Sequence, residues 1–247
     1  MKVSIITVAY NSVKTIQKTF DSVRNQTYTD IEYIVVDGNS NDGTKDLITA
    51  NNDMITRWVS EPDQGLYDAM NKGIALATGD VIGILNSDDT FKSNNVVCEV
   101  VFFLKNYPHI DACIGNVEIH DKNGKVHRRY QSQKWQPWKL KWGLMPPHPS
   151  IFIKPSVYRQ FGHFNTQFKI GADFEIITRF FLKEKIPWKY SGITTTSMLE
   201  GGLSNGGLKS YLILSKECVK ALQINALGVF SYLSVFRGFF KLNSFFK

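Results

Sequence analysis

Apolar residues follow two different periods in the first half of the chain. Val3 to Val8 and Ile31 to Val36 are short apolar runs rich in β-branched residues, which is typical of buried strands. Between them lies one apolar stripe, made of Val13, Ile16, Phe20 and Val23. Its 3-4-3 spacing predicts a helix with one buried face.

The same alternation continues to residue 85. Ile55 to Ser60 and Val81 to Leu85 predict two more strands, and a helical stripe runs between them from Tyr67 to Ala77. Strands that alternate with helices predict an α/β fold, in which helices flank a mainly parallel, Rossmann-like sheet.

The second half has a less regular pattern. Strands are predicted within 111–120 and 125–131, followed by an irregular segment over 134–150. A helix is expected from about Asp173 to Lys185, and the chain from Leu208 to Lys247 has a helical, aromatic and basic pattern.

Polar sequences follow three of the predicted strands at the point where each strand ends. They read "TVAYN", "DGNSNDG" and "NSDD". Ligands of parallel α/β sheets bind beyond the carboxyl ends of the strands, so we expect Asp37, Asp88 and Asp89 to converge on one edge. Adjacent carboxylates suit Mg²⁺ or Mn²⁺, although a surface loop would also tolerate the pair.

Composition narrows the class of protein. The 247 residues are 43% hydrophobic and 21% charged, which is ordinary for a globular protein. Lysine and arginine number 29 against 22 aspartates and glutamates, a net charge of +7 that favours an anionic partner such as a nucleotide phosphate, a nucleic acid or an acidic membrane. Three cysteines without a CxxC motif predict a reducing compartment and neither a disulfide framework nor a zinc site.

Four motifs in order carry a resemblance to a known family. They are "VSIITVAYNS", "IEYIVVDGNSNDGT", "EPDQGLYDAMNKGIALATGDVIGILNSDD" and "GADFEIITRF". Together they resemble glycosyltransferase family 2, inverting enzymes of the GT-A fold, and most of all the bacterial members that build surface polysaccharides such as capsule, O-antigen or exopolysaccharide. The resemblance implies transfer of a sugar from a nucleotide-diphosphate donor, with a UDP-sugar favoured, to a saccharide, lipid-linked acceptor.

The resemblance also implies an organisation of the chain. A GT-A domain would span 1–206, with 1–90 binding the nucleotide sugar and 91–206 supplying acceptor and catalytic groups, and 207–247 would form a helical tail.

Individual roles follow from the matched motif positions. The implied nucleotide-sugar-binding residues are Thr7, Ala9, Asn11, Asp37, Asp63, Asn71 and Asp88. Asp89 would hold Mn²⁺ or Mg²⁺ on the diphosphate, and Asp173 would act as the general base. The sequence departs from the family pattern twice, because Asn86 replaces an Asp in the metal motif and Ala172 replaces the Glu before Asp173.

Four residues of the irregular segment have two interpretations each. Trp135, Trp138 and Trp142 could stack on an acceptor sugar or pack a flap against the core. His148 could join the metal site or bind phosphate, or it could be an ordinary structural histidine.

The tail and the overall charge leave further alternatives. Residues 207–247 carry six basic side chains and one acidic one, 6 − 1 = +5, together with many phenylalanines. This pattern predicts a helix lying on the inner face of the cell membrane and hence a cytoplasmic, peripheral protein; the alternative is a helix that packs on the domain or on a second copy. A catalytically inactive sugar-nucleotide binder and a nucleic-acid binder are the rival functions. We expect no nucleic-acid partner, because the three strand-end acids would repel its phosphates.

Overall fold

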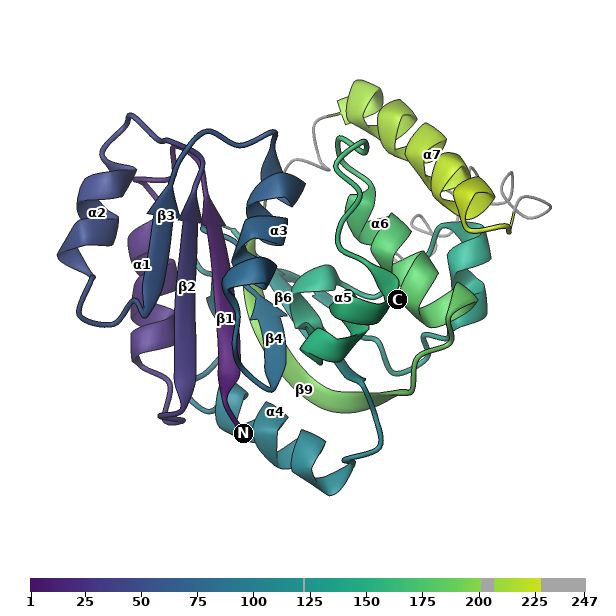
Figure 1. Cartoon of the computed structure of the whole chain (residues 1–247), viewed down its shortest axis with the longest axis horizontal. Coiled ribbons are helices and arrows are strands. Elements are labelled where there is room, and N and C mark those ends of the chain that lie inside the picture. Colours follow the sequence, from purple (N-terminus) through teal and green to yellow (C-terminus); the bar gives the residue numbers. More distant parts are fainter. Residues whose placement is uncertain (122, 201–206, 228–247) are drawn as a thin grey trace.

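The computed structural model describes residues 1–121, 123–200 and 207–227 (Figure 1). Four parallel strands form its first half: β1 (Val3–Ala9), β2 (Ile31–Asp37), β3 (Arg57–Ser60) and β4 (Val81–Ile84). They lie in the order β3-β2-β1-β4. The parallel sheet predicted from the alternating pattern is therefore confirmed.

The second half extends this sheet with strands of both directions. They are β5 (Asp89–Phe91), β6 (Ala112–His120), β7 (Val126–Tyr130), β8 (Ile151–Ile153) and β9 (Trp188–Leu199). The short β8 runs antiparallel between β4 and β6, β9 is parallel to β6, and β5 and β7 pair antiparallel with β9 and β6. The described sheet is thus mixed, with its parallel part at one side.

Helices connect and cover the strands. Those that precede β6 are α1 (Ile16–Arg24), α2 (Thr44–Ala50), α3 (Leu66–Leu76) and α4 (Val96–Asn106). The second half contains the 3-10 helices η1 (Pro137–Trp142) and η2 (His148–Ser150), then α5 (Pro155–Phe161), α6 (Ala172–Ile177), its π-helical continuation η3 (Thr178–Lys183), and α7 (Gly207–Ile224). The helix predicted over 173–185 corresponds to α6 with η3.

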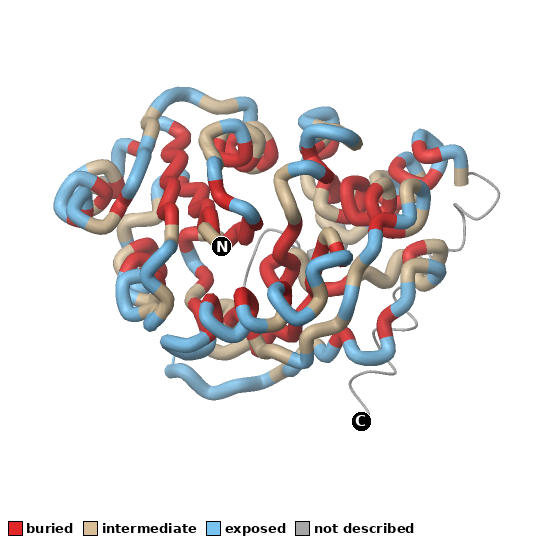
Figure 2. Tube along the Cα trace, turned by 60° about the horizontal axis from the view of Figure 1, so that its bottom comes forward, coloured by how far each residue is buried: buried red, intermediate tan, exposed pale blue. Residues whose placement is uncertain are grey.

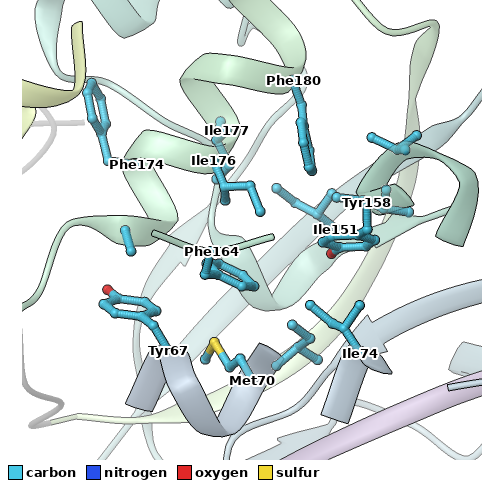
Figure 3. Close-up of a cluster of buried hydrophobic side chains, with 14 of the residues drawn as sticks. Tyr67, Met70, Ile74, Ile151, Tyr158, Phe164, Phe174, Ile176, Ile177 and Phe180 are labelled. Atoms are coloured by element: carbon cyan, nitrogen blue, oxygen red, sulfur yellow. The ribbon is translucent and has the colours of Figure 1, made fainter. Parts of the chain in front are cut away.

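Alternation along the strands divides the core into two layers, one on each face of the sheet. In β1, Ile5 packs in the layer of α1 and α4, whereas Ile6 packs in the layer of α3, α5 and α6. Buried stretches therefore run along the strands and the inner helix faces in Figure 2. The second layer is rich in aromatic rings, such as Tyr67, Phe164 and Phe174 (Figure 3). This layer joins α3 to α6 and fixes the relative positions of the two halves.

The described part of the predicted tail packs on the rest of the protein. Cys218, Ala221 and Leu222 of α7 are buried in the same layer as α6. Within 207–227, the helix therefore packs on the domain, which was the alternative to a helix lying on a membrane. Residues 228–247, which carry all six phenylalanines behind the membrane prediction, lie outside the described residues. No helix within the described ranges is long and apolar enough to cross a membrane.

Candidate active site

Three strand-end loops meet at one edge because β1 lies between β2 and β4 in the sheet. Asn11, just after β1, donates its backbone N–H to Ser40 Oγ at 2.8 Å and accepts from the backbone N–H of Asn41 at 3.1 Å. On the other side, Ser12 Oγ and Ser87 Oγ share a hydrogen bond of 2.8 Å. The three loops with the sequences "TVAYN", "DGNSNDG" and "NSDD" therefore lie together at one edge, as predicted.

Asp37 organises the loop after β2 from inside the protein. Its side chain is fully buried, accepts hydrogen bonds from Ser40 Oγ and from the Ser40 N–H (3.0 Å), and accepts a third from Ser60 Oγ at 2.6 Å. These contacts fix the loop that borders Asn11. Direct contact between Asp37 and a nucleotide stays a prediction.

Thr7 and Ala9 are also interior residues. Thr7 is buried in β1, where its hydroxyl accepts a hydrogen bond of 3.0 Å from Tyr33, and the Ala9 carbonyl accepts from the Gly38 N–H at 2.8 Å. Both residues set the positions of the backbone at the edge. Whether they line a nucleotide pocket stays a prediction.

An aromatic ring and a carboxylate flank Gly38. A β-carbon placed at Gly38 would lie 2.4 Å from Asp63 Oδ2 and 3.3 Å from Tyr10 Cδ2, so no larger residue fits there without a rearrangement. Asp63 also accepts a hydrogen bond of 2.8 Å from the Gly65 N–H. The Tyr10 side chain is 66% exposed. Sequence reasoning missed Tyr10, although a large aromatic residue in a polar strand-end loop was a visible signal.

Asp89 is a buried acid with little compensation. Its side chain is 1% exposed and accepts one hydrogen bond of 3.1 Å from Asn86 Nδ2. Burial, and then the neighbouring charge of Asp88, raise the pKa of Asp89 well above its ordinary value of 3.8. Desolvation also raises the pKa of Asp88, whose side chain reaches solvent. Asp88 and Asp89 are neighbours, and the charged form of each is disfavoured. A bound cation would stabilise both charges, so this site is suited to a cation.

Asn86 supplies an independent sign of a missing partner. Its Oδ1 atom is buried and has no hydrogen-bond partner among the described residues, which is unusual for a buried polar atom. Hard oxygen donors at Asn86, Asp88 and Asp89 fit Mg²⁺ or Mn²⁺. No group of three or more His, Cys, Asp or Glu able to hold a metal occurs in the described parts of the chain. A cation here would depend on few carboxylates together with ligand oxygens, as is usual for Mg²⁺.

His148 lies in η2 and contacts an aromatic ring. Its imidazole packs edge-on to Phe164, with 5.6 Å between ring centroids, and burial lowers its pKa to about 4. The ring is therefore neutral at pH 7, the form in which histidine binds metals. Within the described ranges it does not complete a three-residue metal group with Asp88 and Asp89. A role for His148 at the metal or at phosphate stays a prediction.

Asn71 joins the two halves of the protein. Its Nδ2 donates to the Phe164 carbonyl and its Oδ1 accepts from the Phe164 N–H, both at 2.9 Å. Both polar ends of the amide are thus engaged by the backbone. The nucleotide-binding role implied for Asn71 stays a prediction.

Asp173 lies beside the start of α3. It is the second residue of α6, and its Oδ1 accepts a hydrogen bond of 2.7 Å from the Phe174 N–H. Desolvation and then the charge of Asp173 raise the pKa of the Tyr67 phenol, so this carboxylate and Tyr67 are close. Tyr67 also donates a hydrogen bond to the Ile170 carbonyl. Since α3 directly follows the loop of Asp63, the predicted base and the predicted donor loop border the same helix end.

The three tryptophans have different environments. Trp135 is buried, donates from Nε1 to the Leu144 carbonyl at 3.1 Å, and packs against Phe181 and Trp188. Trp142 is half-buried, whereas Trp138 is 53% exposed. Trp135 thus packs in the core, and Trp138 has the most open ring of the three; acceptor stacking by Trp135, Trp138 or Trp142 stays a prediction.

Comparison with known sequences points to one family. The family model described as "Glycosyl transferase family 2" matches residues 4–177. An uncharacterized glycosyltransferase of Mycobacterium tuberculosis is 33% identical over 186 residues, covering 72% of this chain and 68% of the relative. A PGL/p-HBAD biosynthesis glycosyltransferase of Mycobacterium bovis is 29% identical over 232 residues, covering 92% and 86%.

Solved structures agree with the sequence comparison at the level of the fold. A fragment of S. aureus TarS in complex with UDP-GlcNAc superposes with a TM-score of 0.71 at 16% identity, covering 90% of this chain and 66% of that one. The mannosyltransferase PcManGT from Pyrobaculum calidifontis, in complex with GDP-Man and Mn²⁺, gives 0.67 at 17% identity, covering 96% and 69%.

Proposed function

The chain belongs to glycosyltransferase family 2 and has the GT-A fold, and we propose that it transfers a sugar from a nucleotide-diphosphate donor, with a UDP-sugar favoured, to a saccharide acceptor. The observation that carries this proposal is the edge where the loops after β1, β2 and β4 meet around an exposed aromatic ring and buried acids. The complexes of TarS with UDP-GlcNAc and of PcManGT with GDP-Man support this class of donor.

Donor binding would use the surface of this edge. The exposed ring of Tyr10 offers a face on which a nucleobase can stack, and Asp63 beside it offers a carboxylate to polar groups of the nucleoside. Asn11 has a left-handed backbone with φ of 49° and an exposed side chain, and it would line the rim of the donor site. Asp37 and Ser40 would keep this loop in place from below.

The diphosphate would bind next to the acidic loop. Asp89, Asp88 and the unpartnered Oδ1 of Asn86 would hold Mn²⁺ or Mg²⁺. Such an ion, when bound, supplies Lewis-acid stabilisation of negative charge on a leaving diphosphate. The Mn²⁺ present in PcManGT supports this choice of cofactor. The bound cation would also compensate the buried negative charge of Asp89, which is unfavourable in the free protein.

Asp173 would act as the general base. The acceptor hydroxyl would give its proton to the Asp173 carboxylate while its oxygen attacks the anomeric carbon and the bond to the diphosphate breaks. Attack on the face opposite the leaving group inverts the anomeric configuration. The hydrogen bond from the Phe174 N–H would keep the carboxylate oriented.

The acceptor would be a saccharide, carried by a lipid. Trp138, with the most open tryptophan ring, is the acceptor-stacking residue of this proposal. The basic and aromatic sequence of 207–247 supports a location of the enzyme at the inner face of the cell membrane, where a lipid-linked acceptor would be presented.

The proposal is tested by nucleoside diphosphate release from a panel of UDP- and GDP-sugars, each with Mn²⁺ and again with EDTA. We expect one donor to turn over with Mn²⁺, faster when a mixture of acceptor saccharides is added, and EDTA to abolish the release. Absence of turnover with every donor and acceptor, from folded protein that still binds a nucleotide sugar, would support the inactive-binder alternative.

A further inference from the structure

Glu217 connects α7 to the loop that precedes Asp173. Its carboxylate accepts three backbone hydrogen bonds from consecutive residues: the N–H of Lys169 at 2.8 Å, of Ile170 at 3.0 Å and of Gly171 at 2.8 Å. Hydrogen bonds to an ionised acceptor are stronger than neutral ones. One side chain of α7 therefore fixes the backbone of three residues that end two positions before the proposed base.

The contact between α7 and this loop is close and depends on a glycine. Gly171 is buried, and a β-carbon at this position would lie 3.1 Å from Glu217 Cβ and 3.2 Å from Leu214 Cδ1. Both of these atoms belong to α7. A side chain at residue 171 would require Glu217 and Leu214 to shift by a few tenths of an ångström, at the residue that supplies the acceptor of the loop's hydrogen bonds.

The opposite side of the same peptide segment is held by α3. Tyr67 donates its hydroxyl to the Ile170 carbonyl, so Ile170 is fixed through its N–H by Glu217 and through its C=O by Tyr67. The charges of Asp173 and Glu217 both contribute to the raised pKa of the buried Tyr67 phenol, which places the two acids around one residue. The loop is thus clamped between α3 and α7.

A second contact fastens the far end of α7. Asn225 Nδ2 donates to Glu175 Oε1 at 3.1 Å, and Glu175 is buried and paired with Arg179 at 2.8 Å. Arg179 in turn donates to the carbonyls of Phe161 and His163. The helix is therefore fastened to the α6 region at two places, through Glu217 and through Asn225 directly after its end.

The residue before Asp173 does not supply the carboxylate that holds the loop. Ala172 is fully buried among apolar side chains, so the residue directly before Asp173 brings no polar group to the loop. The carboxylate that binds the loop comes instead from a helix 46 positions further along the chain.

We propose that Glu217 is a positioning residue for the reaction and that α7 is part of the catalytic unit. Glu217 orients the 169–171 backbone and thereby the start of α6, so that Asp173 meets the acceptor hydroxyl at a productive distance. This role rests on the proposed glycosyl transfer with Asp173 as the base.

The test compares Glu217→Ala and Glu217→Gln with Lys216→Ala, a control at the neighbouring exposed position of α7. Hydrogen–deuterium exchange reports the backbone of 169–171, titration calorimetry reports donor binding, and steady-state kinetics report kcat and KM. All assays are run well below the melting temperature of each variant.

We expect Glu217→Ala to speed exchange at 169–171 by about tenfold or more, because three amides lose their acceptor. We expect kcat to fall roughly 10- to 100-fold, the effect of misplacing a reacting group by about an ångström, while the donor Kd stays within about twofold. Glu217→Gln keeps one acceptor oxygen and should restore part of kcat. Lys216→Ala should match the wild type in every assay.

Two results would overturn the proposal: unchanged exchange at 169–171 in Glu217→Ala, or faster exchange with an unchanged kcat. A wild-type protein without any glycosyl transfer would instead refute the proposed function, while the exchange experiment would still report whether Glu217 holds the loop.

Discussion

The donor edge and the base loop are built in different ways. At the donor edge, the loops after β1 and β2 are joined by contacts such as Asn11 to Ser40, 29 positions apart, between neighbouring parallel strands. The base loop is held by Tyr67, which is 103 positions from Ile170, and by Glu217. The first site follows from strand order, whereas the second requires three distant helices to pack correctly.

This difference implies a division of labour. The donor edge belongs to the rigid parallel sheet, so substitutions there should change ligand binding and leave the backbone intact. The base loop is held by side-chain contacts from α3 and α7, through Tyr67 and Glu217. Substitutions there should change the rate of transfer more than donor binding.

Asp173→Asn should have the largest effect. The amide retains the shape of the side chain but cannot accept the acceptor proton, so kcat should fall by about 10²- to 10⁴-fold. Calorimetric titration with the donor should give an unchanged Kd. If the variant keeps its kcat, another residue is the base and the account of this loop is wrong.

Asp89→Asn should be next, with a loss of about 100-fold in kcat/KM at limiting Mn²⁺. The reason is the loss of the buried anionic ligand for the cation, whose stabilisation of leaving-group charge contributes several kcal/mol. Kinetics at a series of Mn²⁺ concentrations measure this. Activity that is equal to the wild type at every concentration would remove Asp89 from the metal site.

Tyr10→Ala should weaken donor binding by roughly tenfold, since stacking of a base on an aromatic ring contributes about 1–3 kcal/mol. The effect should appear in the Kd for free UDP as well as for the UDP-sugar. Tyr10→Phe is the matched control and should bind like the wild type. Equal weakening by both variants would show that the hydroxyl, and not the ring, makes the contact.

The smallest effect concerns the pH dependence of stability. Because the folded protein raises the pKa of Asp89 above 3.8, the apo protein loses stability as the pH rises through the window between 3.8 and that higher value. Asp89→Asn removes this loss, so its apo form should melt higher at pH 7, by about 2–4 °C for each kcal/mol gained. A lower melting temperature at pH 7 would contradict the account of Asp89 as an uncompensated buried charge.

Glu32, at the amino ends of the strands, has a pKa shift opposite in sign to that of Asp89, and hence an opposite pH dependence of stability. Burial alone would raise its pKa, but hydrogen bonds from Ser4, Thr78 and Lys2 lower it to about 2. Its contribution to stability is therefore complete above its ordinary pKa of 4.5 and is lost as the pH falls towards 2. Melting curves of Glu32→Gln should show less acid sensitivity than the wild type between these values.

The sequence pattern predicted the parallel half of the sheet with small errors at the ends. The run Ile55 to Ser60 was predicted as a strand, and β3 begins two residues later at Arg57. The 3-4-3 stripe predicted α1, which begins at Ile16 and not near Val13. Helix α4 was missed because Val96–Asn106 is rich in β-branched residues, although its buried valines have helical spacing.

The candidate site was predictable where its residues follow strands and not where contacts are distant. Asp88 and Asp89 lie beside the loop of Asn11, as strand order required. The engagement of Asn71 with Phe164 and of Glu217 with Gly171 could not be predicted, because no local pattern links residues so far apart. Trp135 illustrates the same limit, since only packing distinguishes it from the exposed Trp138.

The most direct test of the account is the thermal shift caused by UDP with Mn²⁺ in three proteins: wild type, Asp173→Asn and Asp89→Asn. A ligand that binds the native state raises its melting temperature by mass action. The account predicts equal shifts for wild type and Asp173→Asn, and no Mn²⁺-dependent shift for Asp89→Asn. A full shift in Asp89→Asn, or its loss in Asp173→Asn, would contradict the separation of donor edge and base loop.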